Sequence, residues 1–322
     1  MNGRKLELVA RLQSLLALAV MVAVMSFVSD SFFTADNGLN ILRQISVNLC
    51  LSIGMTLVIL TGGIDLSVGS VLAVSGVVAA GLLRDGFVIP RSGWMVQFNP
   101  SGVVIAAVLV GAALGWVNGT VITRLGVPPF VATLGMLSIA RGLTRIWTGG
   151  HDIYLDNKLA AIGSGTLWKV PAPVWIVAAL AVAATVLTRR TRFGRYAYAI
   201  GGNERAARLS GVPVGRVKVA VFAISGFLAA LAGIIHAGQL NQGSPNDGAG
   251  YELDAIAAVV IGGTSLMGGR GTVAGTLAGA LLLGILNNIL ALNNVDANVQ
   301  LLIKALVIVA AAALLTLRST DE

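Results

Sequence analysis

A single carboxylate stands between two apolar runs in residues 58–69, VILTGGIDLSVG. A charge at the centre of a bilayer costs at least about 2.5 to 3.5 kcal/mol on insertion scales, so Asp65 needs a role that offsets this cost. One role is structural: after Gly62 and Gly63 interrupt a helix, Asp65 would accept backbone N–H bonds as the N-cap of the next helix. The other role is transport, with Asp65 and Ser67 lining a polar path. The predicted spans put Asp65 near the inner membrane face, which favours the cap.

Other polar side chains inside apolar runs allow similar pairs of interpretation. Asn287 and Asn288 lie late in such a run, where they would either bond to a neighbouring helix or contact a transported solute. Glu252 and Asp254 begin a shorter run, where helix capping is the simpler interpretation. The candidate translocation path therefore consists of Asp65, Ser67, Asn287 and Asn288.

Catalytic chemistry has no visible constellation in this chain. A phosphate-binding P-loop needs a Gly-Lys pair, and the sequence contains none. Cys50, His151 and His236 lie far apart without metal-ligand spacing, and no Gly-x-Ser-x-Gly stretch is present. We therefore predict no catalytic residue, no metal site and no enzyme activity.

The polar segment 188–218, TRRTRFGRYAYAIGGNERAARLSGVPVGRVK, carries eight basic residues and a single acid, Glu204. Charge alone predicts a loop retained on the cytoplasmic side of a membrane. Within it, however, Asn203 can cap a short helix, Glu204 suits the positive helix end, and Gly211 can take the left-handed terminating conformation. A helix of two turns is marginal alone in water, so this pattern predicts docking to a partner. The candidate docking residues are Gly202, Asn203, Glu204, Arg205, Arg208, Ser210 and Gly211.

Composition predicts the kind of fold that positions these polar side chains. The chain has 322 residues, 56% of them hydrophobic and only 11% charged, which indicates an integral membrane protein of the all-α class. The net charge of +8 does not predict nucleic-acid binding, because no basic soluble domain with interleaved aromatics accompanies it. Ten membrane spans are expected, at 12–28, 41–60, 66–83, 101–123, 128–148, 174–187, 218–237, 253–267, 272–290 and 297–317.

The distribution of charge orients these spans. With a cytoplasmic N-terminus, inner segments hold 14 of the 22 lysines and arginines, whereas nine of the 14 acids fall outside. An even number of spans puts both termini in the cytoplasm, and the positive-inside rule agrees with this arrangement.

A short internal similarity links two glycine-rich breaks. Residues 62–66, GGIDL, and residues 262–266, GGTSL, each follow an apolar run. Paired breaks in two halves of a transporter can mark its substrate path. Five residues in a chain with 40 glycines are also compatible with chance.

Several longer motifs resemble the permease subunits of bacterial ABC importers for monosaccharides, and the ribose-type permeases in particular. They follow the family's order along nearly the whole chain: GMTLVILTGGIDLSVGS at 54–70, PPFVATLGML at 128–137, TRFGRYAYAIGGNERAARLSGV at 191–212, GYELDAIAAVVIGGTSLMGGRGT at 250–272 and GALLLGILNN at 279–288. The segments at 84–100 and 151–170 match less clearly, which leaves the sugar undetermined.

The resemblance implies a single transmembrane permease domain, 1–322, with 188–218 as its cytoplasmic coupling loop. It implies a homodimer in the bacterial inner membrane, surrounded by lipid, that works with a cytoplasmic ABC ATP-binding subunit and a periplasmic sugar-binding protein. ATP and Mg²⁺ would bind to the ATPase subunit, and this chain would hold no cofactor. By the same resemblance, residues 203–211 form the helix that couples ATP hydrolysis to transport.

A transporter driven by an ion gradient is the alternative function. It would need its own intramembrane carboxylate near the midplane, and Asp65 comes nearest to that requirement.

Overall fold

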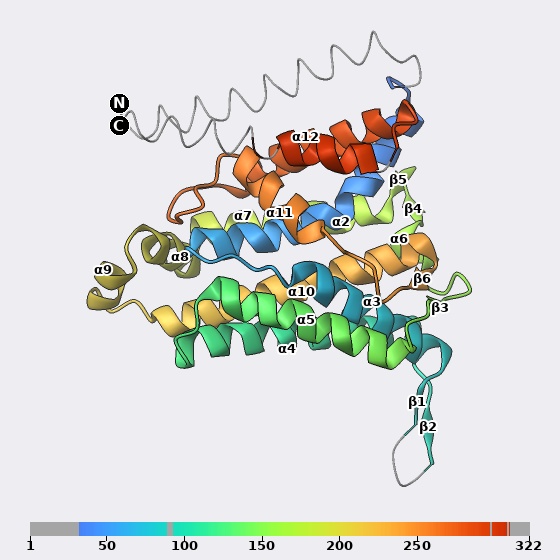
Figure 1. Cartoon of the computed structure of the whole chain (residues 1–322), viewed down its shortest axis with the longest axis horizontal. Helices are drawn as coiled ribbons and strands as arrows, with labels where there is room; N and C mark the ends of the chain where they lie inside the picture. Colours follow the sequence, from blue (N-terminus) through green and yellow to red (C-terminus); the bar gives the residue numbers. More distant parts are fainter. Residues whose placement is uncertain (1–31, 89–92, 297, 308, 310–322) are drawn as a thin grey trace.

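The computed structural model describes residues 32–88, 93–296, 298–307 and 309, which form an elongated bundle of helices (Figure 1). The predicted span at 12–28 lies outside the described residues, as do residues 297, 308 and 310–317 of the last predicted span, while Asn298–Val307 form an apolar helix. The longer helices are α2 (Ala35–Leu60), α3 (Val68–Arg84), α4 (Pro100–Arg124), α5 (Pro129–Thr148), α7 (Ala172–Arg190), α10 (Val214–Leu240), α11 (Tyr251–Ile261) and α12 (Val273–Leu292).

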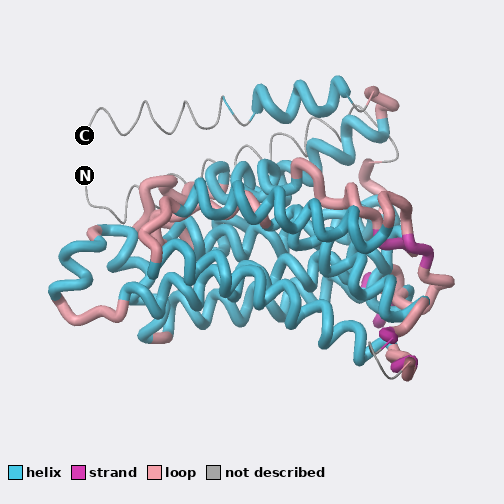
Figure 2. The backbone as a smooth tube through the Cα atoms, turned by 60° about the horizontal axis from the view of Figure 1, so that its bottom comes forward, coloured by secondary structure: helices cyan, strands magenta, loops and turns pink. Residues whose placement is uncertain are grey.

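Shorter elements gather at the two ends of the bundle. The helices α8 (Arg192–Gly202) and α9 (Glu204–Leu209) project beyond one end, whereas the strands lie at the other (Figures 1 and 2). In the described residues the strands are two residues long and form three antiparallel pairs, and α6 is a single turn beside them. The pairs are β1 (Phe87–Val88) with β2 (Met95–Val96), β3 (Ile153–Tyr154) with β6 (Gln242–Gly243), and β4 (Thr166–Leu167) with β5 (Val170–Pro171), while α6 covers Ala160–Gly163.

Within the described residues, five helices are long and apolar enough to cross a membrane: α2, α4, α7, α10 and α12. This finding supports a multi-pass membrane protein, while the number of ten spans stays a prediction. The predicted span at 253–267 is wrong at its C-terminal end, because α11 ends at Ile261 and does not continue through 267. The predicted span extends past this end because the apolar Leu266 and Met267 follow the glycines and the short polar pair Thr264 and Ser265.

The two glycine-rich breaks end their helices in the same way. Gly62 donates to the Ile59 carbonyl at 2.8 Å and has φ 75°, and Gly263 donates to the Val260 carbonyl at 2.8 Å and has φ 82°. The next residue in each case bonds one carbonyl further back, at Val58 and Val259, which completes a Schellman motif. The similarity in sequence therefore reflects a shared helix ending, shifted by one residue from the sequence alignment.

Helix α10 lies at the centre of the fold, in contact with α2, α3 and α4. Glycines spaced four residues apart on α4 let its backbone approach α10 closely. A Cβ atom on Gly115 would collide with the Phe222 carbonyl oxygen, and one on Gly119 would lie 2.6 Å from the Cα atom of Val219. Small residues at a helix contact allow this approach, which membrane helices use for packing.

The chain between α2 and α3 does not turn at the end of the bundle. Residues 61–67 are not helical and run back beside α2, so that α3 begins inside the bundle (Figure 1). The start of α3 also lies against the segment before α11, where a Cβ on Gly69 would clash with the Gly248 carbonyl. Two helices thus begin within the protein interior.

Candidate functional site

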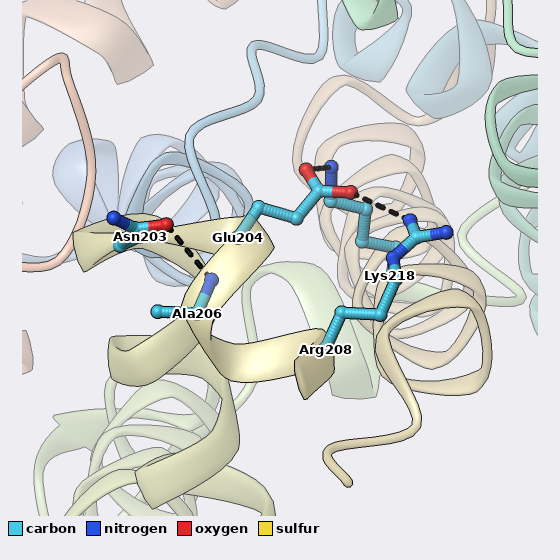
Figure 3. A network of polar contacts seen from close by, with 5 residues as sticks. All are labelled: Asn203, Glu204, Ala206, Arg208 and Lys218. Atoms are coloured by element: carbon cyan, nitrogen blue, oxygen red, sulfur yellow. Dashed lines mark hydrogen bonds and ion pairs between the residues drawn. The ribbon is translucent and has the colours of Figure 1, made fainter. Parts of the chain in front are cut away.

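Helix α9 has the local structure that its sequence predicts. The Asn203 side chain accepts a hydrogen bond from the Ala206 N–H at 2.9 Å, and so confirms Asn203 as the N-cap (Figure 3). At the other end Gly211 has φ 81° and donates to the Arg208 carbonyl at 3.1 Å. Gly211 thus ends the helix in the left-handed conformation that glycine favours.

Glu204 joins α9 to the central helix. Its carboxylate accepts a hydrogen bond from Lys218 Nζ at 2.6 Å and one from Arg208 at 3.1 Å (Figure 3). Lys218 belongs to the beginning of α10, and its side chain is only 15% exposed. The hydrogen bond from Lys218 holds the pKa of Glu204 below its ordinary value of 4.5, and Arg208 acts in the same direction. The Glu204 carboxylate is therefore ionised at neutral pH.

The outer face of α9 presents charge and one large apolar side chain. Leu209 is 85% exposed, and Arg205 and the Arg208 side chain, which is 70% exposed, accompany it. Ala207 is the buried residue of the helix. A leucine held in water beside two arginines suits contact with another protein, because apolar and Arg side chains carry much of the energy of such contacts. Leu209 and Lys218 were not among the residues selected from sequence.

The base of the projecting helices is packed against both helix breaks. Gly269 donates to the Leu60 carbonyl at 3.1 Å, which joins the segment after α11 to the end of α2. Gly201, near the end of α8, lies between the same two residues, where a Cβ would clash with Leu60 and Gly269. Tyr198 adds a hydrogen bond of 2.8 Å to the Gly271 carbonyl. Helix α8 thus rests on α2 and on the segment that links α11 to α12, whereas α9 contacts α8 and α10.

Asp65 differs from its expected position and role. It is 1% exposed and accepts hydrogen bonds from the Ser67 N–H at 3.0 Å, the Ser67 hydroxyl at 2.6 Å and the Ser225 hydroxyl at 2.9 Å. The N-cap position of α3 belongs to Ser67, so Asp65 is not the cap. Val214 begins α10 at the end of the bundle where α9 lies. Ser225, which bonds to Asp65, lies about 16 Å further along α10, at a rise of 1.5 Å per residue. Asp65 is therefore not at the inner end. The reason is the return of residues 61–67 into the bundle.

Ser67 extends this network to a third helix. Its hydroxyl accepts a hydrogen bond from Asn118 of α4 at 3.0 Å while donating to Asp65. Asp65, Ser67 and Asn118 are all about 1% exposed. Together these bonds fix the α2–α3 segment to α4 and α10.

The two asparagines of α12 have different surroundings. Asn288 exchanges two hydrogen bonds with Asn37 of α2, at 2.9 and 3.0 Å, which is the interhelical alternative. Asn287 instead borders a polar cavity. The four predicted path residues therefore fall into separate places in the fold, with Asp65 and Ser67 together and the asparagines apart from them.

The acids at the start of α11 do not cap it as expected. Gly250 occupies the N-cap position, without a side-chain hydrogen bond to the helix. The Asp254 carboxylate lies 3.7 Å from Lys304 Nζ, so its partner is a side chain from the C-terminal part of the described chain.

Comparison with known proteins gives one family across most of the sequence. Residues 37–312 match the family described as branched-chain amino acid transport system / permease component. The chain is 47% identical over 304 residues to the ribose import permease protein of Escherichia coli K12, covering 93% of this chain and 91% of the relative. It is 43% identical over 307 residues to the ribose import permease protein of Bacillus subtilis, with 94% and 92% covered. It is 38% identical over 299 residues to the D-allose transport system permease protein of Escherichia coli K12, with 92% and 89% covered. No solved structure matches the chain.

Proposed function

The chain belongs to the family described as branched-chain amino acid transport system / permease component, and we propose that it is the membrane subunit of an ABC importer for a ribose-like monosaccharide. The relatives support a sugar over an amino acid, because their names specify ribose and allose at 38% to 47% identity. The chain is a transport component and not an enzyme. ATP and Mg²⁺ bind to the partner ATPase subunit in this proposal.

The observation that carries the proposal is the form of α9. A helix of six residues is marginal alone in water, yet this one is capped at both ends and held to α10 by the Glu204–Lys218 pair. It presents Leu209, Arg205 and Arg208 outward at the end of the bundle where the basic segment 188–218 lies. A permease without its own P-loop needs such a surface to receive work from an ATPase.

The proposed complex contains further members. Two copies of this chain would form the pathway in the inner membrane, two ATP-binding subunits would dock on α9 in the cytoplasm, and a periplasmic binding protein would deliver the sugar. Residues 203–211 would form the coupling helix, with Gly202 at its base.

Coupling would proceed by rigid-body movement through the contacts at the base of α9. Closure of the ATPase dimer displaces α9, and the Lys218 contact passes this displacement to α10. The packing of Gly201 between Leu60 and Gly269 passes it to α2 and to the segment that follows α11. Helices that are packed this closely move as bodies because their contacts do not deform continuously.

Reconstituted vesicles provide the test. The permease, its ATPase and the binding protein are placed in liposomes, and uptake of D-ribose, D-allose and L-arabinose is measured with and without ATP. We expect uptake of at least one of these sugars to require ATP and to continue after ionophores collapse the proton and sodium gradients. Purified permease alone should hydrolyse no ATP.

The opposite pattern would contradict the proposal. Sugar uptake that stops when the gradients collapse, and that continues without ATP, would identify an ion-driven transporter. A complex that imports none of the sugars would contradict the proposed substrate class.

A further inference from the structure

A polar cavity of about 310 Å³ lies between α2, α10, α11 and α12. This volume falls at the lower end of the roughly 300–1,000 Å³ range of small-molecule sites. Its polar lining includes the side chains of Gln44, Asn48, Gln239, Asp254, Asn287 and Lys304. Most of these groups both donate and accept hydrogen bonds, as a polyhydroxylated solute requires.

The cavity is at the end of the bundle away from the coupling helix. Gln239 is the residue before the last of α10, whose beginning holds Lys218 in contact with Glu204. Given a cytoplasmic α9, the cavity lies in the outer half of the protein, where a solute released outside would arrive first.

The unpaired side-chain oxygen of Asn287 indicates that this cavity binds a ligand. Its Oδ1 atom is buried and accepts no hydrogen bond from the part of the chain that the structure describes. A buried polar atom without a partner costs about 1–3 kcal/mol, whereas the adjacent Asn288 is fully paired with Asn37. Rotation of the Asn287 amide towards the cavity would let an incoming hydroxyl group donate to Oδ1 and remove this cost.

The charges around the cavity favour a neutral solute. Asp254 has Lys304 as its partner at 3.7 Å, so the carboxylate and the ammonium group cancel. The distance is long for such a pair, and both groups keep capacity for hydrogen bonds to a ligand. Tyr251, packed edge-on against His236 with ring centroids 5.7 Å apart, adds aromatic surface beside the apolar Ile45 and Ala280.

We propose that this cavity holds the monosaccharide within the bundle during import, with Asn287 accepting one sugar hydroxyl and the Asp254–Lys304 pair binding others. The inference rests on the proposed function and assigns a solute-binding site within a single permease chain. Asn287 is the residue of the sequence-derived path that contributes to it.

Cysteine protection tests the site directly. Cys50 is the sole cysteine of the sequence and is buried, so a Cys50→Ala chain gives a thiol-free background. Asn287→Cys is then treated with a hydrophilic methanethiosulfonate in the permease–ATPase complex, with and without the sugar that the wild-type complex imports. We expect labelling of this cysteine, slowed severalfold by that sugar. Asn293→Cys, exposed at the end of the same helix, should label at one rate in both conditions.

A second variant measures transport. Asn287→Leu removes the amide, and we expect uptake at limiting sugar to fall about threefold to tenfold while ATP hydrolysis by the assembled complex is retained. If Asn287→Leu does not assemble, the labelling experiment decides. Labelling of Asn287→Cys that sugar does not change, in a complex whose wild-type form imports that sugar, would overturn the site and leave the proposed function intact. Absence of sugar import by the wild-type complex would contradict both.

Discussion

Lys218 of α10 donates a 2.6 Å hydrogen bond to Glu204 of α9, which joins the projecting helix to the helix at the centre of the bundle. The two residues stand on opposite sides of the turn that Gly211 and Pro213 make, so a displacement of α9 reaches α10 without passing through the intervening chain. The structure thus contains a direct connection between the proposed docking surface and the membrane helices.

Breaking this pair should affect coupling more than stability. A partly exposed ion pair contributes about 0–1 kcal/mol, and Glu204 is 41% exposed. We expect Glu204→Gln to lower sugar uptake per ATP hydrolysed, while the unfolding temperature in detergent changes little.

The charge swap Glu204→Lys with Lys218→Glu is the control, since it restores the attraction and should recover uptake relative to Lys218→Glu alone.

Acidification acts in the same direction as Glu204→Gln. Because the pKa of Glu204 is lowered, the pair is kept at neutral pH and is lost only as the pH falls through a value below 4.5. Full uptake per ATP by Glu204→Gln would show that the pair carries no coupling.

Leu209 should contribute to ATPase affinity. Burying a leucine side chain is worth about 1.5–3 kcal/mol, so Leu209→Ser should raise the dissociation constant for the ATPase subunit roughly tenfold or more. Leu209→Met keeps the apolar volume and should bind almost as the wild type does. Binding of the purified subunit to permease in nanodiscs measures both. Equal affinity for all three proteins would place the contact elsewhere.

Asp65 should behave as a structural acceptor. Asn retains an oxygen for the Ser67 N–H and hydroxyl, whereas Ala leaves these donors and the Ser225 hydroxyl buried without a partner, at about 1–3 kcal/mol for each group. We therefore expect Asp65→Asn to assemble and transport, and Asp65→Ala to lower the unfolding temperature and the yield. If both variants fold with wild-type stability and both fail to transport, Asp65 acts on the solute instead.

One glycine of α4 and one of α5 offer a matched pair for packing. Gly115→Ala forces a methyl group against the Phe222 carbonyl and should destabilise the protein by about 1–3 kcal/mol. Gly135→Ala, in α5, meets no atom within 4 Å and should be neutral or slightly stabilising, because alanine favours a helix. Thermal unfolding in one detergent compares them. A stable Gly115→Ala protein would mean that α4 and α10 separate without cost.

The features predicted correctly from sequence are those that depend on neighbouring residues. Asn203 and Gly211 determine the ends of α9 within a few positions of themselves, so local capping rules suffice. The glycines at 62–63 likewise predict the end of α2, whose last residue is Leu60.

The features that sequence reasoning missed depend on contacts between residues far apart in the sequence, or on the direction that the chain takes after a helix ends. Asp65 meets Ser225, which is 160 residues away, and no periodicity indicates that residues 61–67 turn back into the bundle. The Glu204–Lys218 pair needs the turn between α9 and α10. The end of α11 at Ile261 was missed because Leu266 and Met267 follow shortly after it, and hydropathy alone does not locate the end of a helix.

Docking through α9 is the central claim, and ATPase stimulation tests it most directly. The measurement is ATP hydrolysis by the reconstituted complex, with and without sugar-loaded binding protein, for a permease carrying Arg205→Glu and Arg208→Glu. The control carries Arg189→Glu and Arg190→Glu, which make the same charge change on exposed residues at the end of α7. We predict that the α9 variant enters the membrane normally but loses stimulation and uptake, while the control keeps both. Wild-type stimulation and uptake in the α9 variant would contradict the claim.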